Sequence, residues 1–128
     1  SRGLGDVYKR QKYANLAENF VHHEDLRRGG GEYAPRDLPQ SARDDLWKAV
    51  GKMAKFFLRS SSIHVVLERT DAATPTVVRA GADSTDEVRV SGEAGELLLW
   101  LYGRDGAVDV VLTPADEGTT ARIKRHVF

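Results

Sequence analysis

The chain of 128 residues carries 19 basic and 19 acidic side chains, so its formal net charge is zero. This balance argues against a protein built mainly to bind nucleic acid or anionic membranes. The sequence has no cysteine, which excludes disulfides, thiolate metal ligands and a cysteine nucleophile. It contains no apolar run long enough for a transmembrane helix and no apolar leader near its start, so we expect a cytoplasmic protein.

The first eleven residues read as a translated sequencing adapter. In one reading frame, the preceding adapter bases encode Ser1 to Gly5, and the mosaic end of a transposase adapter encodes Asp6-Val7-Tyr8-Lys9-Arg10-Gln11. We therefore expect residues 1–11 to be an artefact. The native sequence would then enter at Lys12, as the N-terminally truncated part of a longer protein.

Two helices are predicted in the first half of the chain. Apolar residues recur at helical spacing between residues 13 and 21, and Gly29-Gly30-Gly31 ends this first helix. A second helix is predicted at residues 41–59, with one apolar face formed by Leu46, Trp47, Val50, Met53, Ala54 and Phe57.

The second half of the chain alternates between strand and helix patterns. Alternating apolar residues predict strands at residues 63–68, 76–80, 87–90 and 107–112. An apolar helix is expected between Gly92 and Gly103, and a final helix at residues 116–126. The chain is therefore predicted to be an α+β protein, divided near Arg59 into a helical part, residues 12–59, and an α+β part, residues 60–128.

Glu18 and His22 form a candidate metal-binding motif in the helical part. They are four residues apart, so on a helix they project from one face at about 40° to each other. A carboxylate and an imidazole at this spacing can bind one divalent metal ion. His23 points about 140° away from Glu18 and does not share this site. Asp25 follows His22 by three residues and is a candidate acceptor that orients the imidazole.

Two of these assignments have a structural alternative. A glutamate and a histidine at this spacing also occur as a solvent-exposed pair that binds nothing. Arg104, the candidate catalytic residue, follows the predicted apolar helix directly after Gly103. Its guanidinium could clamp a carboxylate of a bound ligand, or it could instead bind the terminal carbonyls of the helix.

The pattern Glu18-x-x-x-His22-x-x-Asp25 and two later segments resemble the mycothiol-dependent maleylpyruvate isomerase family. The later segments are residues 91–104, where a glycine precedes a leucine-rich helix that ends in Gly-Arg, and residues 35–39, Pro-Arg-Asp-Leu-Pro, which together with residues 20–28 carry the resemblance to one branch of the family. The similarity covers nearly all of the chain after the adapter segment and is greatest to an uncharacterised actinobacterial metal-binding branch. It implies the C-terminal remnant of a DinB-like helical bundle, followed by a small sterol-carrier-like α+β domain with a mainly antiparallel sheet.

The resemblance also implies a function. In this family a divalent metal, with zinc the expected ion, is held by a histidine from an earlier helix and by the residues that correspond to Glu18 and His22. The metal activates the thiol of mycothiol, and the thiolate adds to an electrophilic small-molecule substrate. We therefore expect a metal- and mycothiol-dependent isomerase or thiol transferase, present here as a fragment that lacks one ligand, binds metal weakly and is inactive.

Two alternatives to this enzyme remain open. One is a helical bundle that binds metal without catalysis, and the other is a module that binds a hydrophobic ligand. Glu24 departs from the family, because an aromatic residue usually stands at this position.

Overall fold

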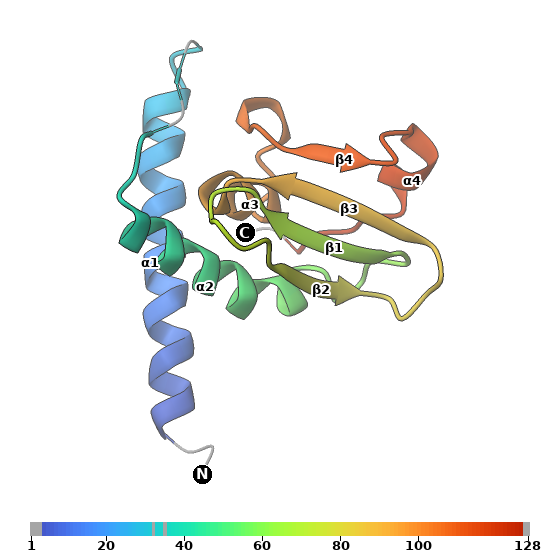
Figure 1. Cartoon of the computed structure of the whole chain (residues 1–128), viewed down its shortest axis with the longest axis horizontal. Helices are drawn as coiled ribbons and strands as arrows, with labels where there is room; N and C mark the ends of the chain where they lie inside the picture. The colour runs from blue at the N-terminus through green and yellow to red at the C-terminus, as the bar shows by residue number, and fades with distance from the viewer. Residues whose placement is uncertain (1–3, 32, 35, 127–128) are drawn as a thin grey trace.

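Helices pack on one face of a four-stranded sheet in the computed structural model of the chain, which describes residues 4–31, 33, 34 and 36–126 (Figure 1). The spatial order of the strands is β2-β1-β3-β4. β1 pairs antiparallel with β2 and parallel with β3, and β3 pairs antiparallel with β4. The expected α+β class with a mainly antiparallel sheet is thus confirmed. The strands span β1 (His64–Arg69), β2 (Val77–Gly81), β3 (Glu87–Gly92) and β4 (Val111–Thr113).

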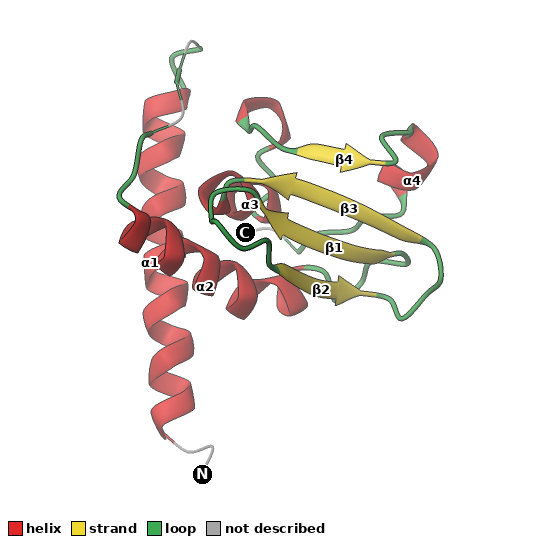
Figure 2. Cartoon of the chain, viewed as in Figure 1, coloured by secondary structure: helices red, strands yellow, loops and turns green. Residues whose placement is uncertain are grey.

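Most of the chain outside the sheet is helical (Figure 2). The longest helix, α1, crosses α2, and its N-terminal turns extend beyond that helix (Figure 1). Residues 4–11 of the expected adapter segment belong to this same helix, whereas residues 1–3, and Pro35 of the family-like segment, lie outside the described residues. The helices are α1 (Leu4–Arg28), α2 (Gln40–Phe57), α3 (Ala94–Leu101), the 3-10 helix η1 (Asp105–Ala107) and α4 (Glu117–Ala121).

In the described part of the chain, none of the helices combines the length and the apolar character needed to cross a lipid bilayer.

The core lies between the sheet and the helices α2 and α3. Alternate residues of β1 and β3, among them Val65, Leu67, Val88 and Val90, are fully buried on the face that meets these helices. All eight residues of α3 are buried, as its nearly continuous apolar sequence predicts. Buried side chains of α1, α2, the sheet and α3 form one apolar cluster, which therefore includes residues on both sides of Arg59.

α1 reaches α3 because Gly95 has no side chain. A Cβ atom at Gly95 would lie 2.8 Å from Cζ of Phe20, which is closer than carbon atoms pack. The absence of this atom lets the aromatic ring of Phe20 lie directly on the backbone of α3. The contact joins the helix that carries Glu18 and His22 to the rest of the core.

Two elements near the C-terminus are shorter than the sequence predicts. The strand expected at residues 107–112 is limited to β4, because the backbone before it binds buried charged side chains instead of β3. The Ala107 carbonyl accepts a hydrogen bond from Arg28 at 2.7 Å, and the Asp109 amide donates to Glu96 at 3.0 Å. The helix expected at residues 116–126 is the five-residue α4, which begins after Asp116, whose carboxylate caps the Thr119 amide at 2.8 Å.

Candidate functional site

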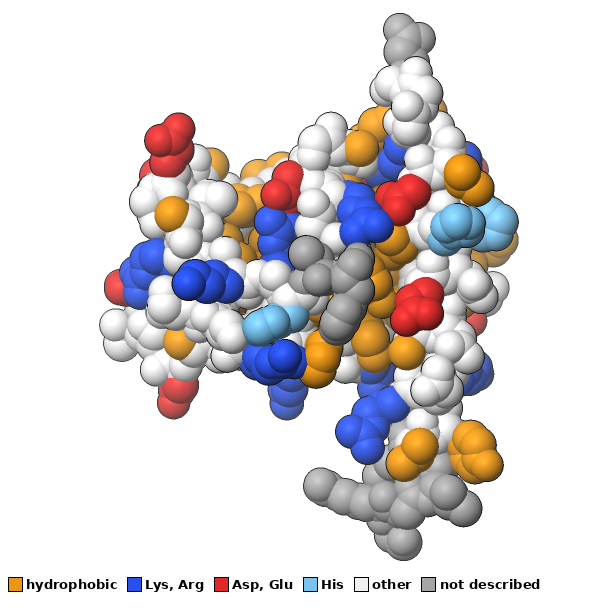
Figure 3. Space-filling view, turned by 180° about the vertical axis from the view of Figure 1, so that it is seen from behind, with side chains coloured by type: hydrophobic (Ala, Val, Ile, Leu, Met, Phe, Trp, Pro, Cys, Tyr) orange, Lys and Arg blue, Asp and Glu red, His pale blue; other side chains and the backbone are white. Residues whose placement is uncertain are grey.

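Glu18 and His22 lie on an exposed face of α1 beside a shallow pocket of about 200 Å³. Asp25 borders the same pocket about two turns after Glu18, and Tyr102 and Arg104 enter it from the segment that follows α3. The acidic and histidine side chains of α1 are visible on the right of the molecule in Figure 3. The pocket therefore brings together all of the site residues proposed from the sequence: Glu18, His22, Asp25 and Arg104.

Asp25 and Arg104 form a two-point ion pair at the edge of this pocket. Nε and Nη2 of Arg104 donate to the two carboxylate oxygens of Asp25 at 3.2 and 2.8 Å, which fixes the plane of the guanidinium group. The hydrogen bond from Arg104 lowers the pKa of Asp25, and the same bond raises the pKa of Arg104. Among the described hydrogen bonds, the Asp25 carboxylate thus binds Arg104 and not the His22 imidazole.

Arg104 also makes the contact that the structural alternative predicts. Its Nη1 donates to the carbonyl oxygen of Tyr102, at the C-terminal end of α3. The groups that accept hydrogen bonds from the Arg104 side chain, the Asp25 carboxylate and the Tyr102 carbonyl, thus both belong to the protein. The guanidinium is held in one orientation at the pocket, where about a third of the Arg104 side chain remains exposed.

Tyr102 supplies a neutral hydrogen-bond donor to the pocket. Burial raises the pKa of its phenol, and the negative charge of Glu18 raises that pKa further. The phenol therefore stays protonated at neutral pH and can donate to a ligand oxygen.

Glu18 and His22 are available to a ligand. Neither side chain makes a hydrogen bond or ion pair with any described residue. The His22 ring contacts the ring of His23, with centroids 6.4 Å apart and planes at 65°. The carboxylate oxygens of Glu18 and the imidazole nitrogens of His22 are therefore open to a ligand.

These residues do not complete a metal centre by themselves. A protein zinc site needs at least three protein ligands. No group of three or more metal-binding side chains occurs within the ranges that the structure describes. Glu18 and His22 supply two, and Asp25 is engaged by Arg104. Two other histidines make contacts elsewhere and do not line this pocket: His64 binds the Ala82 carbonyl, and His126 binds the Ser60 hydroxyl.

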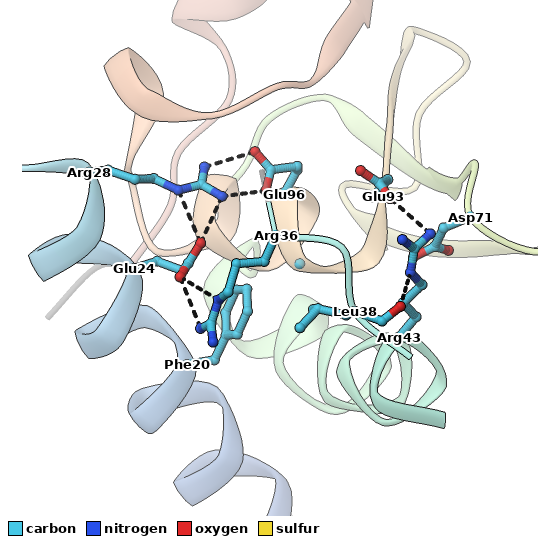
Figure 4. Close-up of a pocket in the computed structure, with 10 residues that line it drawn as sticks. Phe20, Glu24, Arg28, Arg36, Leu38, Arg43, Asp71, Glu93 and Glu96 are labelled. Atoms are coloured by element: carbon cyan, nitrogen blue, oxygen red, sulfur yellow. Dashed lines mark hydrogen bonds and ion pairs between the residues drawn. The ribbon is translucent and has the colours of Figure 1, made fainter. Parts of the chain in front are cut away.

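A buried charged cluster around Glu24 was not identified from the sequence (Figure 4). The Glu24 side chain is 1% exposed, although charged residues are rarely buried unless they are paired. Its Oε1 accepts hydrogen bonds from Arg28 at 3.2 and 3.0 Å, and its Oε2 contacts Arg36 at 3.0 and 2.9 Å. The Glu24–Arg28 spacing of four residues is a sequence signal that points to half of this cluster.

A second, largely apolar pocket of about 280 Å³ lies between α3, β4 and the C-terminal segment. Arg125 and Asp105 form an ion pair at its edge, with nitrogen–oxygen distances of 2.6 and 2.8 Å. The Arg125 guanidinium also stacks 4.6 Å from the centre of a Trp100 ring. The apolar walls of the pocket are formed by Trp100, Val108, Val110, Leu112 and Ile123.

Comparisons of the chain with protein-family models, with curated proteins and with solved structures found no match.

Proposed function

We propose that Glu18 and His22 contribute two ligands to a divalent-metal centre, with zinc the expected ion, in a mycothiol-dependent enzyme of the maleylpyruvate isomerase type. The enzyme would be an isomerase or a thiol transferase located in the cytoplasm. One observation carries the proposal: both side chains lie unpaired among the described residues, on one exposed face of α1, beside the guanidinium of Arg104. The described residues supply only two ligands, so we expect the remaining ligand from outside them.

We expect Arg104 to bind the carboxylate of a ligand in this pocket. A carboxylate of the substrate or of the thiol cofactor would compete with Asp25 for the guanidinium, which Asp25 and the Tyr102 carbonyl hold in position. The protonated Tyr102 phenol would donate to the same ligand. The expected substrate is therefore an electrophilic small molecule that carries a carboxylate.

Zinc titration of the chain, followed through the imidazole NMR signals, tests the ligand assignment. We expect weak binding that shifts the His22 signals and is lost in Glu18→Ala and His22→Ala. His23→Ala is the matched control, because His23 is also exposed on α1 but does not line the pocket. Stoichiometric zinc binding at micromolar affinity would contradict the two-ligand arrangement. A loss of zinc binding in His23→Ala equal to that in His22→Ala would contradict it as well.

Turnover distinguishes the enzyme from a bundle that binds metal without catalysis. The assay uses a longer protein that contains this chain and the expected upstream histidine. We expect product formation that requires mycothiol and is abolished in His22→Ala but retained in His23→Ala. Metal binding without mycothiol-dependent turnover would support the non-catalytic alternative.

The apolar pocket supports a second candidate, a module that binds a small hydrophobic ligand. Its volume of about 280 Å³ lies near the lower end of small-molecule sites. Trp100 lines the pocket, so its fluorescence should respond to an apolar ligand such as a medium-chain fatty acid. Leu112→Arg should abolish this response, whereas a substitution at the exposed Val77 should not. An unchanged fluorescence at saturating fatty acid would reject this candidate.

A further inference from the structure

A groove with a basic lining lies where the C-terminal end of α2 meets the edge strand β2. Its volume is about 400 Å³, which exceeds that of the Glu18–His22 pocket. Lys55 comes from the last turn of α2, Arg59 from the turn that follows this helix, His64 from β1 and Arg79 from β2. Three cationic side chains and one imidazole, from α2, the turn after it, β1 and β2, thus line one groove.

The positive charge in this groove is only partly compensated. In the described part of the chain, Lys55 and Arg59 have no ion-pair partner, and Arg79 contacts Glu87 at 3.4 Å. This last pair is exposed on both sides, so solvent screens its attraction. The formal net charge of the whole chain is zero, so the groove is a local excess of positive charge rather than part of a basic surface.

Contacts with neighbouring groups restrain three of the groove side chains, those of His64, Arg79 and Arg59. Nδ1 of His64 lies 3.0 Å from the Ala82 carbonyl, and because a carbonyl only accepts, this nitrogen carries the proton. Nε2 of His64 therefore faces Nη1 of Arg79 at 3.5 Å. The guanidinium of Arg59 stacks 4.2 Å from the ring of Phe56, which limits its freedom. The guanidinium groups of Arg59 and Arg79 are thus each restrained by a neighbouring ring before any ligand binds.

We propose that this groove binds the phosphate group of a small phosphate monoester. A phosphate monoester carries nearly two negative charges and three acceptor oxygens, which matches the three cations contributed by Lys55, Arg59 and Arg79. The carboxylate of Asp83 also lines the groove and has no described partner, so it can accept a hydrogen bond from a hydroxyl group of the organic part. A phosphorylated, hydroxyl-bearing small molecule fits this arrangement.

The groove and the Glu18–His22 pocket have no lining residue in common. Phosphate binding can therefore be present or absent whatever the outcome of the zinc titration. The two proposals fail separately, because the variants that test each one change different residues.

Ribose 5-phosphate is the test ligand, with ribose as the uncharged comparison, and binding is followed by amide NMR shifts and calorimetry. We expect saturable one-to-one binding of ribose 5-phosphate, shifts centred on His64 and Gly81, and no binding of ribose. Arg79→Gln and Lys55→Gln should each weaken the affinity about tenfold, as the loss of a charge-assisted hydrogen bond does. Lys48→Gln is the matched control, because it removes the same charge from α2 outside the groove.

Three results would overturn the proposal. The first is an absence of saturation at about 10 mM ribose 5-phosphate, because a specific phosphate site should be saturated at this concentration. The second is an equal weakening in Lys48→Gln, which would indicate attraction to the overall charge. The third is tighter binding of a ten-residue oligothymidylate that displaces ribose 5-phosphate, which would make the groove part of a polyanion surface.

Discussion

Arg28 and Glu96 are 68 residues apart in the sequence and meet in the interior of the protein through two hydrogen bonds of 2.8 and 2.7 Å. Both side chains are about 5% exposed or less. Burial alone lowers the pKa of Arg28, but its bonds to Glu96 and Glu24 outweigh that effect and raise the pKa above its ordinary value. The contact joins the C-terminal end of α1 to α3, and through the Ala107 carbonyl it also holds the segment before β4.

Arg28→Met should therefore be strongly destabilising. It leaves the buried carboxylate of Glu96 without its cation, and breaking one side of a buried ion pair costs about 3–5 kcal/mol. Urea unfolding followed by circular dichroism measures the change in the free energy of unfolding. Arg10→Met, on the exposed start of α1, serves as the control and should change stability by no more than about 0.5 kcal/mol. A loss below about 1 kcal/mol for Arg28→Met would contradict the role of this pair.

The Asp25–Arg104 pair should contribute a small, pH-dependent stability. The hydrogen bond from Arg104 lowers the pKa of Asp25 from its ordinary value of 3.8. The stability that the pair contributes is therefore complete above pH 3.8, and it is lost as the pH falls through the lowered pKa of Asp25. At pH 7, Asp25→Asn should cost less than about 1 kcal/mol, because both side chains are partly exposed and solvent screens the pair. The difference between wild type and variant, measured by urea unfolding, should shrink at pH 3. A difference that grows at low pH would contradict this assignment.

Asp71 is expected to stabilise the start of α3 from the loop that follows β1. Its side chain is 1% exposed, and its two oxygens accept hydrogen bonds from Arg69 at 2.6 Å and from the Ala94 amide at 3.0 Å. Asp71→Ala removes both bonds and should cost about 2–3 kcal/mol in chemical denaturation. Asp45→Ala, at an exposed position of α2, is the comparison and should leave stability unchanged. Equal effects of the two substitutions would mean that the buried carboxylate contributes nothing.

Gly81 should tolerate no side chain. Its φ angle is +82°, and an added Cβ would lie 2.5 Å from the Ile63 carbonyl oxygen. Gly81→Ala combines a left-handed backbone penalty with overpacking, and we expect a loss of about 2–4 kcal/mol. Gly106→Ala is the matched control, since an added Cβ there meets no atom within 4 Å. Thermal unfolding of both variants measures the loss of stability. A melting temperature of Gly81→Ala equal to that of Gly106→Ala would refute the requirement for glycine at position 81.

The helical part of the candidate site was predictable from the sequence because helix geometry acts over a few residues. The spacing of Glu18, His22 and Asp25 places all three on one face of α1, and this face lines the pocket. The partner of Asp25 was not predictable, because Arg104 is 79 residues away and reaches α1 only after α3 has packed. The position of Arg104 directly after the apolar helix made it a candidate site residue but did not predict this ion pair.

Local pattern therefore determined the order and approximate position of the helices and strands, because periodicity and glycine act on neighbouring residues. Gly31 and Gly103, with φ angles of +101° and +83°, follow the ends of the helices as predicted. Tertiary structure alone decided the parallel pairing of β1 with β3, the burial of Glu24 and Glu96, and the late start of β4. Charged side chains are normally exposed, so their burial depends on partners that only the folded chain brings together.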